Sequence, residues 1–248
     1  MKRILVCILL TAFALIMVAC SLQNNTSLQS SNLRKEFEEI GGFRVVFSMD
    51  KQNDNQITTE QIEATKDILS YRLEQMGIIK RIITSSDTRN IIVEFIFDKN
   101  LDLNRIQTIM DIASRKGYLT FQEIDENMKD MNGVYTQTDK VILDGREISR
   151  IEVSDSNNGK VDILIELDKD TSRIFEEKTG QLIGKKLGIF MDNELISAPM
   201  ISASIPGGKF AISSQFTKED AINFAIIVRS GVLPVGLIQT NIESVPKP

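Results

Sequence analysis

The chain has 248 residues, a formal net charge of −5, no histidine and no tryptophan, and its two cysteines, Cys7 and Cys20, both lie in the first twenty residues. The rest of the chain therefore cannot form a disulfide, an imidazole acid–base pair, or a zinc or haem site with cysteine or histidine ligands. An acidic chain with no long basic run also lacks the clustered cations that bind nucleic acid. We expect a protein that is not an enzyme, uses no cofactor or metal and has no nucleic-acid partner.

The first twenty residues are typical of a lipoprotein signal sequence. A basic start, Lys2-Arg3, precedes an apolar run over residues 4–18, which is short for a membrane span and suits a signal peptide. The run ends in Met17-Val18-Ala19-Cys20, which resembles the bacterial lipobox, where the chain is cut before a cysteine that becomes acylated. We predict a signal peptide over residues 1–19 and a lipid on Cys20, with an uncleaved anchor as the alternative.

Acylation would decide where the protein resides. Several acyl chains on Cys20, palmitate among them, would hold it stably on the cell membrane, at the extracytoplasmic face, because each buried methylene contributes about 0.8 kcal/mol. Residues 21–33 are rich in serine, asparagine, glutamine and threonine, which is typical of a flexible linker. We therefore predict a flexible tether over residues 20–41, with a reach of roughly 20 Å for about 15 residues.

The next segment alternates between strand and helix patterns. Thr58 and Gln61 are spaced as in a capping box, and Gly77 suits the end of the helix that they begin. The order strand, helix, strand, strand, helix, strand is the ferredoxin-like plan, so we predict a ferredoxin-like βαββαβ base over residues 42–124. Its expected elements are strand 43–49, a helix from 58 to 76, strands 78–84 and 91–97, helix 103–114 and strand 118–124.

A second unit follows, over residues 125–230. It has hairpin signals, a short helix and a final amphipathic helix that begins with Thr217 and Asp220. Residues 232–238 form a strand pattern with no local partner, so we expect residues 231–248 to return to the base. The fold class is then α+β, with an α+β head subdomain inserted into the base. The expected head elements are strands 140–143, 148–153, 161–167, 187–191 and 195–196, and helices 170–178 and 218–229.

Several blocks of sequence, in a fixed order, carry a family resemblance. The longest is residues 184–199, GKKLGIFMDNELISAP, and shorter blocks lie at 72–78, 143–153, 205–208, 216–221 and 230–235. Together they resemble SecD, the accessory subunit of bacterial protein translocase, over residues 42–237. The resemblance implies a large extracytoplasmic domain with a ferredoxin-like base and an inserted head. SecD proteins continue into membrane helices that couple export to the proton gradient, and we expect this chain to lack that motor.

Two weaker motifs suggest other chemistry. Ser48-Met49-Asp50-Lys51, Ser154-Asp155-Ser156 and Lys178-Thr179-Gly180 follow the order of the penicillin-binding set, but the first ends a strand and the last ends a helix, opposite to what that set requires. Residues 50–61 approach a calcium loop, yet they lack its glycine at the sixth position and its glutamate at the twelfth. We interpret the first as chance and the second as a solvated loop.

The sequence thus favours a binding module. We expect a membrane-anchored, SecD-like protein whose partners are the bilayer, through acylated Cys20, and unfolded exported polypeptides or a translocase subunit. The alternative is a structural or assembly lipoprotein of the cell envelope that uses the fold as a scaffold. A hydrolase is disfavoured by the composition. The sequence identifies no partner-binding residues.

Overall fold

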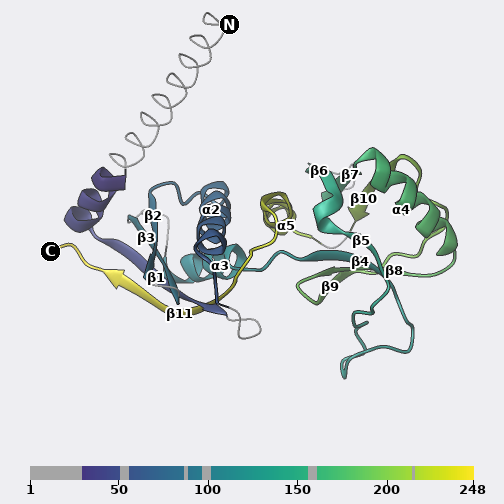
Figure 1. The fold of residues 1–248 in the computed structure, drawn as a ribbon, viewed down its shortest axis with the longest axis horizontal. Coiled ribbons are helices and arrows are strands. Elements are labelled where there is room, and N and C mark those ends of the chain that lie inside the picture. The colour runs from purple at the N-terminus through teal and green to yellow at the C-terminus, as the bar shows by residue number, and fades with distance from the viewer. Residues whose placement is uncertain (1–29, 51–55, 87–88, 97–101, 156–160, 214–215) are drawn as a thin grey trace, which may run out of the picture.

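The computed structural model describes residues 30–248 except for residues 51–55, 87–88, 97–101, 156–160 and 214–215. The predicted signal peptide, Cys20 and the first part of the predicted tether lie outside the described residues. The described chain forms two lobes, which we call the base and the head (Figure 1). Each lobe has its own hydrophobic core, and the lobes are joined by two short segments of chain.

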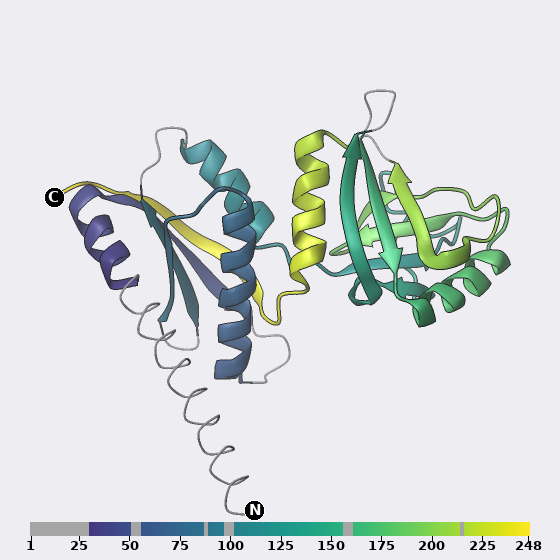
Figure 2. The ribbon, with the colours of Figure 1, turned by 90° about the horizontal axis from the view of Figure 1, so that it is seen from above.

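The base is an antiparallel four-stranded sheet covered on one face by two helices (Figure 2). Alternate side chains of its first strand, Phe43, Val45 and Phe47, are buried against helix residues such as Leu69 and Met110. The sheet order is β11-β1-β3-β2, and the elements follow the ferredoxin-like plan in chain order. They are β1 (Gly42–Asp50), α2 (Thr59–Gln75), β2 (Arg81–Ser86), β3 (Asn90–Ile96), α3 (Leu103–Ala113) and β11 (Gly236–Val245).

The head consists of two sheets and two helices around a second core. Three phenylalanine rings meet at its centre, with Phe121 5.6 Å from Phe210 and Phe210 5.0 Å from Phe175, centroid to centroid. One sheet has the order β5-β4-β8-β9 and the other β10-β7-β6. The elements are β4 (Leu119–Glu123), β5 (Val141–Asp144), β6 (Ile148–Asp155), β7 (Val161–Leu167), α4 (Lys169–Gln181), β8 (Leu187–Met191), β9 (Glu194–Ser197), β10 (Lys209–Ser213) and α5 (Lys218–Ser230), with short 3₁₀ turns at Gly145–Glu147 and Pro206–Gly208.

The fold class agrees with the sequence prediction, but one strand belongs to the other lobe. Residues 118–124 are expected to complete the base, whereas β4 lies in the head sheet between β5 and β8. The fourth base strand is β11, which pairs with β1 along its length. Alternation of apolar residues predicts that a strand exists, and it does not say which strand is its neighbour. The head therefore begins near residue 117 rather than at residue 125.

A second correction concerns the predicted tether over residues 20–41. Residues 30–40 form a helix against the base. Phe37 is only 3% exposed, and its ring lies so close to Gly42 that a Cβ there would come within 2.7 Å of it. Arg34 pairs with Glu94, which is itself bonded to Arg44. The prediction is wrong for residues 30–40 because it rests on the polar composition of the segment, whereas a single aromatic side chain, Phe37, docks the helix on the base.

This docking gives a test of stability. We expect Phe37→Ala to lower the free energy of unfolding by about 3 kcal/mol, because it leaves a cavity in a packed site. Glu39→Ala, on the exposed side of the same helix, should change it by less than about 0.5 kcal/mol. Urea unfolding followed by circular dichroism measures both variants. Equal stability of the two would mean that residues 30–40 are a tether after all.

Candidate functional site at the junction of base and head

The two segments that connect the lobes meet at one buried side chain. Arg72, near the end of α2, is fully buried, with 0% of its surface exposed. It lies between the outgoing segment, residues 113–118, and the returning segment, residues 230–235. Its guanidinium bonds to both of them.

The hydrogen bonds of Arg72 use all three of its nitrogen atoms. Nη1 and Nη2 donate to backbone carbonyls of both segments, and Nε donates to a serine hydroxyl. A planar guanidinium with five fixed N–H groups suits this task, because it can serve several acceptors at once. The acceptors are the carbonyls of Ala113 (2.9 Å), Arg115, Lys116 (3.5 Å) and Gly231 (2.7 Å), and Oγ of Ser230 (2.7 Å).

The glycines of the connecting segments make room for this arrangement. Gly117 has φ +83°, and a Cβ at this position would lie 2.7 Å from Nη2 of Arg72. Gly231 also has φ +83°. An L-residue with a side chain is strained in this region of φ, so both turns depend on glycine.

The charge of Arg72 is retained although the side chain is buried. Burial lowers its pKa to about 10, and the negative charge of Asp192 opposes that shift. The guanidinium is therefore protonated at neutral pH. Asp192 is held by the backbone N–H groups of Gly117 (3.0 Å) and Tyr118 (2.7 Å), and it lies 3.7 Å from Nε of Arg115. The turn between β8 and β9 thus reaches the junction from the head side.

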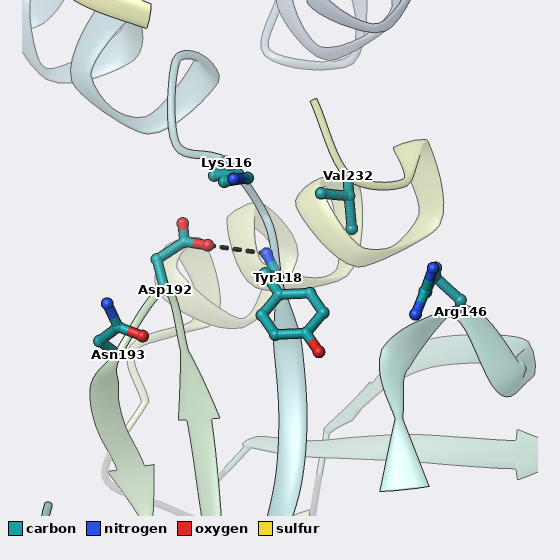
Figure 3. A pocket seen from close by; sticks show the side chains of 6 residues that line it. All are labelled: Lys116, Tyr118, Arg146, Asp192, Asn193 and Val232. Atoms are coloured by element: carbon teal, nitrogen blue, oxygen red, sulfur yellow. Dashed lines mark hydrogen bonds between the residues drawn. The ribbon is translucent and has the colours of Figure 1, made fainter. Parts of the chain in front are cut away.

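A cavity of about 410 Å³ opens beside this turn (Figure 3). Asp192 and Asn193 both have positive φ, +51° and +73°, and the Asp192 carboxylate points toward the outgoing segment, where it accepts a hydrogen bond from the Tyr118 N–H. Burial and the nearby Asp144 raise the pKa of the Tyr118 phenol, so the phenol is neutral and can donate a hydrogen bond. The lining carries charges of both signs and can bind polar groups. It consists of Lys116, Tyr118, Arg146, Asp192, Asn193 and Val232.

On another side of the junction, helix α5 connects the head to the base. It contacts α2, and Glu219 in its first turn pairs with Arg105 of α3. A groove of about 390 Å³ lies between these helices. The head therefore contacts the base through a helix and two connecting segments, and Arg72 bonds to both of those segments.

Comparison with known proteins shows what the domain resembles. Residues 121–235 match the family described as SecDF, P1 head subdomain. The protein translocase subunit SecD of Sebaldella termitidis is 30% identical over 197 residues, and that of Dictyoglomus turgidum is 26% identical over 195 residues. These alignments cover 79% of this chain in each case, and 45% and 44% of the relatives. The chain thus spans a little less than half the length of these curated relatives.

Solved structures share the fold. A crystal structure of SecDF in a super-membrane-facing form aligns with a TM-score of 0.71 and 22% identity, over 85% of this chain and 31% of that one. A second SecDF structure, described as a membrane component that enhances protein export, aligns with a TM-score of 0.63 and 22% identity, over 81% of this chain and 99% of that one. This chain carries a SecD-like domain. Among the described residues of the domain, no helix has the length and apolar composition needed to span a bilayer.

The match also agrees with the corrected lobe boundary. The range that matches the head family begins inside β4 and ends just before β11. In the SecD-like domain, β4 is therefore a head strand by both sequence family and sheet pairing. The predicted boundary at residue 125 is too late because the sequence argument counts β4 as the last base strand.

Cys20 lies outside the described residues. Ser48 is in β1 of the base, whereas Lys178 and Thr179 are in α4 of the head, so the penicillin-binding pattern is divided between the two lobes. Thr179 is buried, and its hydroxyl donates to the carbonyl of Phe175 at 2.8 Å.

The last residues of the calcium-loop pattern form the start of helix α2. Residues 51–55 lie outside the described residues, but Thr58 and Gln61 form the predicted capping box at the start of α2. Within the described parts of the chain, no group of three or more acidic side chains is placed to hold a metal ion. Sequence reasoning assigns no role to Arg72, the first residue of the family block 72–78, although its position carries a signal. It lies three residues after Leu69, on the buried side of α2, where a charge is rare unless it is paired.

The junction gives a second test. We expect Arg72→Met to lower the free energy of unfolding by at least about 3 kcal/mol, because several buried carbonyls lose their donor. Arg72→Lys should not restore it, since an ammonium cannot bridge both segments. Arg173→Met, on the exposed surface of α4, is the matched control. Urea unfolding and the distance distribution between probes on β2 and α4 measure the effect.

A single narrow distance distribution in Arg72→Met, with stability equal to that of the control, would contradict the role assigned to Arg72. A broadened distribution with both cores intact would place its effect at the junction.

Proposed function

We propose that this protein is an extracytoplasmic binding module of protein export, which contacts exported polypeptides or a translocase partner without turning them over. The observation that carries the proposal is the match of the head to a SecDF head subdomain, together with relatives named as protein translocase subunits. A SecDF structure with the same fold is described as enhancing protein export. For this chain we take over only the general role of that domain, which is contact with proteins during export.

The architecture is suited to holding a client. The head is a separate lobe with its own core, joined to the base at a junction whose two connecting segments share one buried arginine. A lobe held in this way presents its surface in a fixed orientation to whatever the base is attached to. Binding without chemistry is all that the proposal asks of the head.

The membrane anchor is the second part of the proposal. The signal layout supports cleavage after residue 19 and acylation of Cys20. Between Cys20 and the helix that begins at residue 30 there are residues 21–29, which can span at most about 32 Å. The base would then stay within that distance of the extracytoplasmic face of the cell membrane.

The binding role is tested by crosslinking in cells. We expect photo-crosslinkers at exposed head positions, such as Leu164 and Ile183, to trap secretory chains or a translocase subunit. Matched crosslinkers at exposed base positions, Ile79 and Leu103, report contacts that do not need the head. Capture of other copies of this chain or of wall proteins only, with export kinetics unchanged on deletion, would favour the alternative, a structural or assembly lipoprotein of the envelope.

The anchor is tested separately. We expect Cys20→Ala to abolish labelling by a palmitate analogue and to release the protein from the membrane or leave uncleaved precursor. Cys7→Ala, in the same signal sequence, should be labelled normally. Undiminished labelling of Cys20→Ala would rule out this anchor.

A further inference from the structure

Strand β6 forms one edge of the three-stranded sheet of the head. It pairs with β7 on one side, and the sheet order places no described strand on its other side. A groove of about 520 Å³ follows this edge. Its lining is residues 148–152, five consecutive residues of the strand, together with Val228 and Arg229 at the end of α5.

The backbone groups that face the groove can be assigned from the register. Arg150 lies opposite Glu166, and the Ser149 hydroxyl donates to the Glu166 carbonyl at 2.8 Å, so this carbonyl points toward β6. In an antiparallel pair, residues bond to the partner strand and face away from it in alternation. Arg150 therefore faces β7, and the backbone of Ile151 faces the groove.

A side chain already occupies this edge. Nη2 of Arg229 donates to the carbonyl of Ile151 at 2.8 Å. Arg229 is otherwise exposed, and the acceptor is an uncharged carbonyl. A carboxylate is a stronger acceptor for a guanidinium than a carbonyl is. A ligand with a carboxylate can therefore compete with the Ile151 carbonyl for the guanidinium of Arg229.

We propose that the β6 edge binds an extended polypeptide segment as an added strand, with an aspartate or glutamate of that segment on Arg229. This inference rests on the proposed function and specifies how the head would hold its client. The bound segment would bond to the outward N–H and C=O groups of Ile151 and Val153, as in other cases of strand addition.

The lining favours a polypeptide as the occupant. Over these five strand residues, roughly 14 Å, alternate residues turn their backbone donors and acceptors toward the groove, and the backbone of another strand has the matching spacing. Charge selects the acidic residue, because Arg150 is paired with Glu152 at 2.6 Å while Arg229 bonds to a neutral group. Main-chain bonds would supply affinity for many sequences, and Arg229 would supply a preference among them.

The opposite edge of the same sheet provides an internal control. By the same alternation, Phe210 of β10 bonds to Ile165, and the backbone of Ala211 faces away from β7. The groove with the Arg229 guanidinium lies at β6, whereas the cation of β10, Lys209, is paired with Glu166 at 3.1 Å.

Amide hydrogen exchange of the full chain in detergent micelles tests the site. The probe is a short peptide of alternating valine and threonine with a central glutamate. We expect the peptide to slow exchange at Ile151 and Val153 by about tenfold or more and to leave Ala211 unchanged. The same peptide with N-methylated backbone nitrogens cannot form the ladder and should protect neither amide.

Two variants test the role of the charge. A peptide with a central lysine should bind about two- to fivefold more weakly than the glutamate peptide. Arg229→Gln should abolish that preference, whereas Arg173→Gln, on α4, should keep it. Protection of Ile151 and Val153 with an unchanged preference in Arg229→Gln would overturn the assignment of Arg229.

The two levels of proposal fail differently. If exported chains crosslink to the head but the amides of Ile151 and Val153 are not protected by the peptide, strand addition at β6 is wrong and the proposed function stands. If no exported chain or translocase subunit crosslinks to the head at all, the proposed function is wrong.

Discussion

The guanidinium of Arg72 binds both segments of chain that run between the base and the head, and the arrangement of the two lobes depends on this one interaction. A fully buried cation is costly unless its N–H groups are satisfied. Its acceptors here are carbonyls and one serine hydroxyl of the connecting segments themselves. Any rotation of the head that pulled one segment away would leave a buried charge without part of its hydrogen bonding. The geometry of the junction is therefore fixed by the need to satisfy Arg72.

The insertion topology explains why one residue can have this effect. The head is inserted between α3 and β11, so the chain leaves and re-enters the base at nearly the same place. The base sheet is complete only when β11 has paired with β1, some 190 residues away in the sequence. Contacts of such separation form at a high entropic cost. Because Arg72 of α2 bonds to both segments, its hydrogen bonds offset part of the entropic cost of closing this long loop.

The sequence predicts the local features of the molecule better than the long-range ones. The capping box at Thr58 and the helix start at Thr217 are confirmed, because each depends on residues three apart. The partner of β4 and the docking of Phe37 depend on residues far away in the chain, and polar neighbours conceal the latter. Arg72 is visible as a charge within an apolar helix face, but all of its acceptors except the Ser230 hydroxyl are backbone carbonyls, which no side-chain pattern reveals.

The end of α5 joins the junction to the edge of the head sheet. Arg229 bonds to the carbonyl of Ile151 at that edge, and Ser230, the next residue, accepts a hydrogen bond from Arg72. Ser230 also donates to the carbonyl of Ile227, so its hydroxyl is held by the last turn of the helix. At the end of α5, Arg229 thus faces the proposed client site and Ser230 faces the buried guanidinium of Arg72. A bound strand that draws Arg229 away from Ile151 would change the residue next to Ser230, which bonds to Arg72. The end of α5 therefore supports both the binding edge and the junction.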